Sequence, residues 1–197
     1  YLPEGYDGKK KFPLLLFLHG AGERGDNLDL VTVHGPPKLI KKGKKFPFVV
    51  ISPQCPRDSW WDAHALAGLL DSVITMHAID KSRIYCTGLS MGGFGTWELG
   101  SFYPERFAAL APICGIGRWP DSRGYTPFLM SENPVWVFHG AKDSVVPLEE
   151  SQRMVDALKR RGGKPKFTIY PKANHDSWTK SYDNPKLYEW FLSHKIE

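Results

Sequence analysis

A glycine-rich segment at residues 88–93 contains the residue best suited to covalent chemistry. The segment is Gly-Leu-Ser-Met-Gly-Gly, so Ser90 lies at the centre of the pattern G-x-S-x-G. An apolar run precedes it and a helical pattern follows it, which predicts a tight turn between a strand and a helix. Glycines allow the close backbone approach that such a turn needs. The turn would present the Ser90 hydroxyl as a nucleophile; a capping serine in an ordinary turn is the alternative.

Two later residues could activate this hydroxyl. Asp143 and His175 each follow an apolar run that predicts a strand, so both are expected on loops at strand ends. The chain order of serine, acid and histidine is typical of a nucleophilic serine on a strand-to-helix turn. His175 would accept the Ser90 proton, while Asp143 would orient the imidazole and stabilise its charged form. Asp176 is a competing acid, but a residue adjacent to the histidine usually points elsewhere.

Two backbone N–H groups are expected to stabilise negative charge that develops on a substrate oxygen. Met91 follows the nucleophile directly, and Ala21 follows Gly20 in the turn after the first apolar run. Gly22 is the alternative to Ala21. His19 belongs to the same turn, and for it packing or hydrogen bonding of the loop is favoured over a role as a base.

Two tryptophans near predicted strand ends are candidates for substrate binding. Trp61 and Trp178 could form pocket walls that stack on an aromatic group or cover an acyl chain. Ordinary packing is the alternative interpretation for each of them.

Metal and cofactor patterns are missing from the sequence. No pair of histidines has metal-ligand spacing such as H-E-x-x-H. The three cysteines, Cys55, Cys86 and Cys114, are too few and too scattered for a zinc site or a disulfide framework, although a single bridge stays possible. No glycine-rich loop matches a phosphate or dinucleotide fingerprint. We therefore expect neither a metal nor an organic cofactor.

Short apolar runs alternate with helical periodicity along the chain. Strands are predicted at residues 14–18, 48–52, 83–87, 108–113, 135–138 and 166–170. Helices are predicted at residues 62–77, 91–102, 148–161 and 185–194. The alternation predicts an α/β fold with a mostly parallel, doubly wound sheet and helices on both faces. Such a sheet binds ligands beyond the carboxyl ends of its strands.

Composition limits the class of protein and its partners. The 197 residues fit one domain, and 42% hydrophobic and 13% aromatic residues exclude a disordered chain. No apolar run approaches the roughly 18 residues of a membrane span. The formal charge is +5, but the lysine clusters lie beside turn residues and no nucleic-acid module accompanies them. We therefore expect neither a nucleic-acid partner nor a membrane span.

The motif at residues 88–93, with residues 18–27, Asp143 and His175, resembles the α/β-hydrolase superfamily. The stretch Leu-His-Gly-Ala-Gly-Glu-Arg-Gly-Asp-Asn at 18–27, with Ser-Pro-Gln-Cys-Pro at 52–56 and the pair Trp60-Trp61, is similar to small bacterial carboxylesterases. These lie near the polyhydroxybutyrate-depolymerase and feruloyl-esterase-like enzymes. The resemblance covers almost the whole chain. It implies the α/β-hydrolase fold and hydrolysis of carboxylic esters without a metal or organic cofactor.

The resemblance also bears on domain organisation and location. Members of the group often have another domain before the catalytic one, and this sequence opens at Tyr1 without an initiator methionine. We expect residues 1–197 to be a single catalytic domain cut from a longer precursor. A secreted or periplasmic location is slightly favoured over a cytoplasmic one.

The leading hypothesis for function is a serine carboxylesterase that hydrolyses short-chain or aromatic acyl esters through an acyl-enzyme intermediate. Only residues 114–134 separate two predicted strands, and they are rich in turn residues, so no large lid is expected. An open site suits small soluble ester substrates. A thioesterase or a prolyl-oligopeptidase-like peptidase is the alternative. An inactive hydrolase-fold binding module is less favoured because all three proposed catalytic residues are present.

Overall fold

The computed structural model describes residues 1–117 and 132–197. Its six strands form one sheet in the order β2-β1-β3-β4-β5-β6, and every neighbouring pair is parallel. The strands are β1 (Phe12–Leu18), β2 (Val49–Ile51), β3 (Ile79–Leu89), β4 (Ala109–Ile113), β5 (Trp136–Gly140) and β6 (Lys166–Tyr170). The helices are α1 (Gly35–Lys41), α2 (Ala63–Met76), α3 (Met91–Phe102), α5 (Leu148–Arg160), α6 (Trp178–Asp183) and α7 (Pro185–Leu192).

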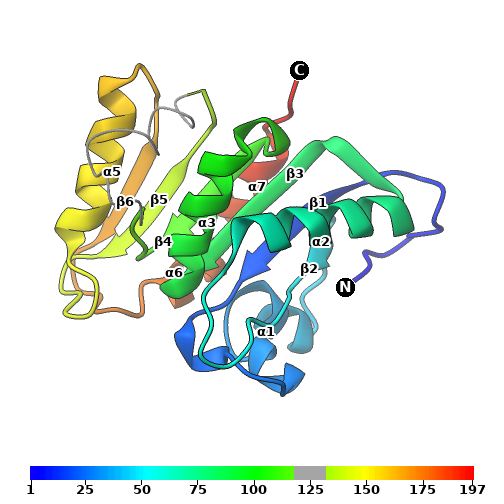
Figure 1. Cartoon of the computed structure of the whole chain (residues 1–197), viewed down its shortest axis with the longest axis horizontal. Helices are drawn as coiled ribbons and strands as arrows, with labels where there is room; N and C mark the ends of the chain where they lie inside the picture. Colours follow the sequence, from blue (N-terminus) through cyan, green and yellow to red (C-terminus); the bar gives the residue numbers. More distant parts are fainter. Residues whose placement is uncertain (118–131) are drawn as a thin grey trace.

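Helices cover both faces of the sheet, and each face has its own apolar core. Strand β1 shows the reason, because successive side chains point to opposite faces and both faces are buried. Leu14 and Leu16 pack with residues of α2, α3 and α5, whereas Leu15 and Phe17 pack with residues of α6 and α7. In Figure 1, α3 crosses in front of the sheet and α7 lies behind it. The predicted doubly wound α/β fold class is thereby confirmed.

Strand pairing is unequal across the sheet. Strand β1 pairs with β3 along most of its length, from Phe12 to Leu18. Between β4 and β5, in contrast, the register is confined to Ile113 opposite Phe138, beside an isolated bridge between Leu110 and Val135. In the described part of the chain, β4–β5 is thus the most sparsely paired junction of the sheet.

Most predicted elements are present, with shifted ends and two omissions. Strand β3 begins at Ile79 rather than at residue 83, because its polar first residues hid it from the apolar pattern. Helices α1 and α6 were not predicted; they have seven and six residues, too few for a clear apolar period. The absence of a large lid was predicted for residues 114–134, and most of this segment, residues 118–131, lies outside the described residues. None of the helices in the described ranges is both long and apolar enough to cross a membrane.

Candidate active site

Ser90 lies in a sharp turn between β3 and α3. Its backbone angles, φ 50° and ψ −116°, are unusual for a residue with a side chain and indicate local strain. The Ser90 N–H donates to the Ile113 carbonyl at 2.9 Å, and the Ser90 carbonyl accepts from the Phe94 N–H at 3.0 Å. Strain of this kind persists only where neighbouring structure enforces it. Here the end of β4 and the first turn of α3 hold the serine in place.

Two glycines make the turn possible by allowing backbones to touch. A Cβ added to Gly92 would lie 1.9 Å from the Leu18 carbonyl oxygen, and one added to Gly88 would lie 2.2 Å from the Gly92 carbonyl oxygen. Any side chain at either position would collide with main-chain atoms. The first turn of α3 therefore packs directly against the end of β1, which brings the loop after β1 to Ser90.

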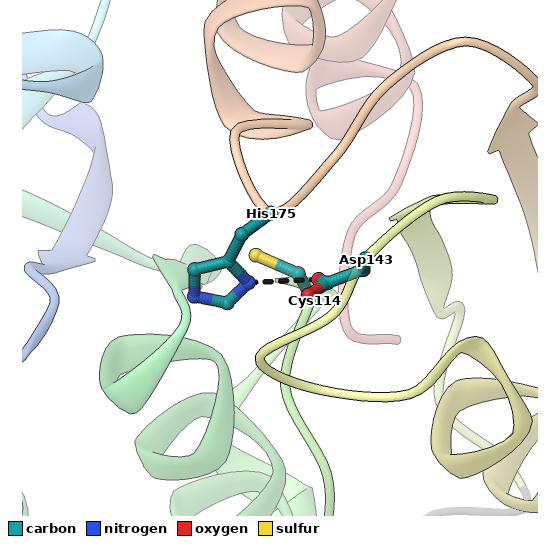
Figure 2. A group of neighbouring side chains, drawn as sticks. All are labelled: Cys114, Asp143 and His175. Carbon is teal, nitrogen blue, oxygen red and sulfur yellow. Dashed lines mark hydrogen bonds and ion pairs between the residues drawn. The ribbon is translucent and has the colours of Figure 1, made fainter.

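The side chains of Ser90, His175 and Asp143 form a continuous hydrogen-bonded series. His175 Nε2 lies 2.9 Å from Ser90 Oγ, and His175 Nδ1 lies 2.7 Å from Asp143 Oδ2. Asp143 follows β5 and His175 follows β6, and Figure 2 shows their side chains meeting across the two loops. The Asp143 side chain is fully buried, whereas the His175 side chain is 19% exposed. The histidine is thus the member of this pair that solvent can reach.

The surroundings of Asp143 keep its carboxylate charged. Oδ1 accepts hydrogen bonds from the N–H groups of Val145 and Val146, both at 2.9 Å. Burial acts to raise the Asp143 pKa, but hydrogen bonds from His175 and from these two N–H groups outweigh it, so the pKa lies below its usual value. A charged carboxylate facing Nδ1 places the imidazole hydrogen there. Nε2 is then free to accept the Ser90 proton.

The two segments expected to supply backbone donors both lie beside Ser90. Met91 is the first residue of α3, where N–H groups lack partners within the helix. Ala21 begins a short 3-10 helix, Ala21–Glu23, directly after Gly20. A Cβ on Gly20 would lie 2.8 Å from Leu89 Cδ1, so this loop touches the residue that precedes Ser90. The assignment of both N–H groups to a substrate oxyanion stays a prediction.

Buried hydrogen bonds fix the loop after β1. His19 is fully buried; its Nε2 accepts from the Cys55 N–H at 2.9 Å, so Nδ1 donates to the Gly20 carbonyl at 2.6 Å. Burial lowers the His19 pKa, which favours the neutral ring that these bonds require. The Gly20 N–H donates to the Glu23 carboxylate at 2.9 Å, and Arg24 Nε donates to the Ala21 carbonyl at 3.0 Å. His19 therefore hydrogen-bonds the backbone of its loop, which is the role that the sequence favoured for it.

The two candidate tryptophans differ in position. Trp61 is 7% exposed, and its Nε1 donates to the His19 carbonyl at 3.1 Å, which favours packing beneath the loop over a pocket wall. Trp178 is half-buried at the start of α6, with its ring perpendicular to that of His175 and 5.2 Å away. Its Nε1 donates to His34 Nδ1 at 3.3 Å. Only Trp178 thus lies directly against the hydrogen-bonded series.

Asp176, the competing acid, has other hydrogen-bond partners. Its carboxylate accepts from the Thr179 N–H and from Thr179 Oγ1, both at 2.9 Å. These bonds satisfy donors in the first turn of α6. The geometry therefore favours Asp143 over Asp176 as the partner of His175.

Two histidines near the site, His34 and His139, were not among the candidate residues of the sequence analysis. His34 accepts from Trp178 and lies 3.8 Å from the Glu23 carboxylate, so it links the loop after β1 to α6. His139 is fully buried, and its Nε2 lies 3.2 Å from Asp143 Oδ2. The only sequence signal for the contact between His139 and Asp143 was their spacing of four residues. That spacing does not predict a contact unless the turn after β5 is known to fold the chain back.

One group of three potential metal ligands lies close together in the described residues. Ligand atoms of Cys114, Asp143 and His175 all lie within 4.8 Å of one another (Figure 2). Burial raises the pKa of the Cys114 thiol to about 12, so it stays protonated near neutral pH, whereas metals bind thiolates. His175 Nδ1 already donates to Asp143. The donor chemistry therefore does not fit a resident metal ion. All three cysteines are free and buried.

Comparison with solved structures supports the fold. A structure described as a thermostable esterase superposes with a TM-score of 0.82 and 32% identity over 99% of this chain. The chain has the α/β-hydrolase fold. A second match, a ferulic acid esterase from the anaerobic fungus Anaeromyces mucronatus, has a TM-score of 0.70 and 19% identity, covering 92% of this chain and 79% of that one.

Sequence comparisons give related matches. The chain is 26% identical over 186 residues to a poly(3-hydroxyoctanoate) depolymerase from Pseudomonas fluorescens, a match that covers 80% of the chain. Residues 121–195 match the model of the prolyl oligopeptidase family. The chain spans 58% of the thermostable esterase structure and 63% of the depolymerase. The resemblance to an esterase group of α/β-hydrolases, expected from residues 18–27 and 88–93, is confirmed.

Proposed function

We propose that this chain is a serine carboxylesterase that hydrolyses short-chain or aromatic acyl esters. The observation that carries the proposal is the pair of hydrogen bonds joining Ser90, His175 and Asp143, at 2.9 and 2.7 Å. The 32% identity to a structure described as an esterase supports the reaction class.

In the proposed reaction, Ser90 Oγ attacks the ester carbonyl carbon while His175 Nε2 takes its proton. The carbonyl oxygen becomes an oxyanion that accepts hydrogen bonds from the N–H groups of Met91 and Ala21. The C–O bond to the alcohol then breaks, and the alcohol leaves with the proton from His175. Water attacks the acyl-enzyme by the same route, releasing the carboxylic acid and restoring Ser90. Asp143 stays ionised throughout and orients the imidazole.

The substrate class rests on two kinds of support. The matched proteins include a ferulic acid esterase and a poly(3-hydroxyoctanoate) depolymerase, whose names indicate an aromatic and an aliphatic acyl group. In this chain, Trp178 places an aromatic ring 5.2 Å from that of His175. Such a ring can contact either kind of acyl or alcohol group.

A peptidase is the second candidate, favoured by the match of residues 121–195 to the prolyl oligopeptidase model. The same serine, histidine and aspartate would then cleave an amide, with an amine as the leaving group. A thioesterase would use the same groups with a thiol as the leaving group. An inactive binding module would not need a strained serine within hydrogen-bond distance of a histidine.

The experiment combines active-site labelling with a substrate panel. A fluorophosphonate should label the parent protein stoichiometrically and should not label Ser90→Ala. The control is Ser72→Ala, since Ser72 is an exposed serine on α2 that bonds only its own helix. Rates with p-nitrophenyl esters of increasing chain length, methyl ferulate, an acyl thioester and an aminoacyl p-nitroanilide would identify the leaving group. Faster turnover of the anilide than of every ester would replace the esterase proposal with the peptidase one. Full activity in Ser90→Ala would overturn both.

A further inference from the structure

His139 is the second-last residue of β5, and its ring lies beside the Asp143 carboxylate, which faces His175. Its ring is fully buried, with Nδ1 2.7 Å from Ser151 Oγ and Nε2 2.9 Å from the Val146 carbonyl oxygen. Nε2 also lies 3.2 Å from Asp143 Oδ2. We propose that His139 is a positioning residue that donates a second imidazole N–H to Asp143 and so sets how strongly Asp143 acts on His175. This inference rests on the proposed serine hydrolase function.

The hydrogen on His139 can be placed from the atoms around the ring. Nε2 faces two oxygens, of Val146 and Asp143, and neither carries a hydrogen when the carboxylate is ionised. Nε2 must therefore be the protonated nitrogen; its N–H bonds to the Val146 carbonyl at 2.9 Å and lies beside Asp143 Oδ2, with Nε2 at 3.2 Å. Nδ1 is then an acceptor, so the Ser151 hydroxyl donates to it rather than to the Gly115 carbonyl at 3.3 Å. Ser151, on α5, thus supplies the donor that the neutral ring needs at Nδ1.

The Asp143 carboxylate is held from several sides. Oδ1 accepts from the N–H groups of Val145 and Val146, and Oδ2 accepts from His175 and lies 3.2 Å from His139 Nε2. These contacts leave the carboxylate little freedom to rotate, so Oδ2 stays in line with His175 Nδ1. The donor from His139 also takes up part of the negative charge on Oδ2. Its loss would leave more of that charge to stabilise protonated His175, which is inactive as the base.

Among the residues that the structure describes, other ionisable groups near this series do not provide the same control. Cys114 lies close to both Asp143 and His175, but burial keeps its thiol protonated in the neutral range. The Asp176 carboxylate is bonded to Thr179 at the start of α6. From α5, the group that faces His139 is the neutral hydroxyl of Ser151. His139 is therefore the group through which α5 reaches the proposed catalytic residues.

Two substitutions separate the nitrogens of His139. In His139→Gln, the side-chain Nε2 takes approximately the position of the imidazole Nε2 and keeps the donor to Val146 and Asp143. In His139→Asn, the shorter amide reaches Ser151 but not Asp143. We expect His139→Asn to lower kcat by about 10- to 100-fold, the range for a hydrogen bond to a charged group, with little change in KM. The acid limb of its kcat/KM profile should move to higher pH. His139→Gln should retain most of the activity and the parent profile.

A control separates this effect from loosening of α5. Val155 is also on α5 and is fully buried, but it belongs to the apolar core between the sheet and helices α2, α3 and α5. Val155→Ala should lower the melting temperature and leave the pH profile in place. If His139→Asn does not fold, Ser151→Ala provides the second test, because it removes the hydroxyl that donates to Nδ1 and holds the ring in place. It should shift the profile in the same direction by a smaller amount.

The outcomes distinguish this inference from the function on which it rests. If parental kcat and an unchanged pH profile are found in folded His139→Asn, or in Ser151→Ala, the inference is overturned while fluorophosphonate labelling of Ser90 still supports the hydrolase. Equal losses in the Gln and Asn variants would also overturn it, because they would show a packing role alone. Failure of Ser90→Ala to lower activity would instead remove the proposed function.

Discussion

Replacement of Gly92 by alanine tests whether backbone contact between β1 and α3 positions Ser90, the proposed nucleophile. The added Cβ would lie 1.9 Å from the Leu18 carbonyl oxygen and 2.8 Å from that of His19. Since carbon and oxygen contact at about 3.3 Å, the first turn of α3 must move by roughly 1.4 Å from β1. A misplacement of about 1 Å can cost roughly 100-fold in rate, and overpacking costs about 1–3 kcal/mol of stability. We expect Gly92→Ala to lower both the turnover rate and the free energy of unfolding, with the larger effect on kcat.

Gly68 on α2 provides the matched control for this substitution. No heavy atom lies within 4 Å of a Cβ added there. Gly68→Ala should stabilise the protein by about 0.5–1 kcal/mol, because alanine favours a helix interior over glycine, and should leave turnover unchanged. Turnover of p-nitrophenyl acetate and urea unfolding would measure both variants. A Gly92→Ala protein with parental kcat and stability would refute the claim that this contact sets the position of Ser90.

Three further expectations follow from the site and the core. The Asp143 pKa is lowered in the folded state, so its contribution to the free energy of unfolding is present above the unfolded value near 3.9 and is lost as the pH falls through the folded value. Urea unfolding between about pH 2 and 6 should therefore show a shallower acid decline for Asp143→Asn than for the parent, and parallel curves would contradict this. Burial raises the pKa of both Cys86 and Cys114 to about 12, so Ellman's reagent at pH 8 should find almost no reactive thiol in the native protein and all three cysteines in urea. Trp178→Phe removes the hydrogen bond to His34 but keeps an aromatic ring beside His175. It should change KM for aromatic esters less than Trp178→Ala does, and equal KM values in the two variants would exclude a role of the ring in binding.

Much of the fold is predictable from the sequence because each buried parallel strand has its own local signal, a continuous apolar run. Continuous apolar runs such as residues 14–18 have no other stable place than a sheet covered on both faces. The position of Ser90 is predictable for a similar reason, since its turn needs glycines at fixed spacing. Helices α1 and α6 escape prediction because short helices are stabilised by packing against distant parts of the chain, such as the contact between α1 and α6, rather than by their own sequences.

The site was less predictable wherever a contact depends on folding of the chain. His139 meets Ser151 of α5, and His34 meets Trp178, which is 144 residues later in the chain. No local pattern encodes such pairs. Trp61 illustrates the opposite case, because its place near a strand end suited a pocket wall, while burial and a hydrogen bond to His19 favour support of a loop. Whether a tryptophan faces solvent or core is decided by the final packing.

The sparse pairing between β4 and β5 divides the proposed catalytic residues between two halves of the sheet. Ser90 and the loop after β1 lie on one side of this junction, and Asp143 and His175 lie on the other. The hydrogen bond between Ser90 and His175 therefore spans the junction with the fewest paired residues among the described strands. We expect mild heating to part the two halves here and to separate the proposed nucleophile from the proposed base before either half loses its helices. Thermal inactivation would then occur at a lower temperature than the loss of far-ultraviolet circular dichroism. An inhibitor bound to Ser90 and in contact with both halves would bring the two transition temperatures together.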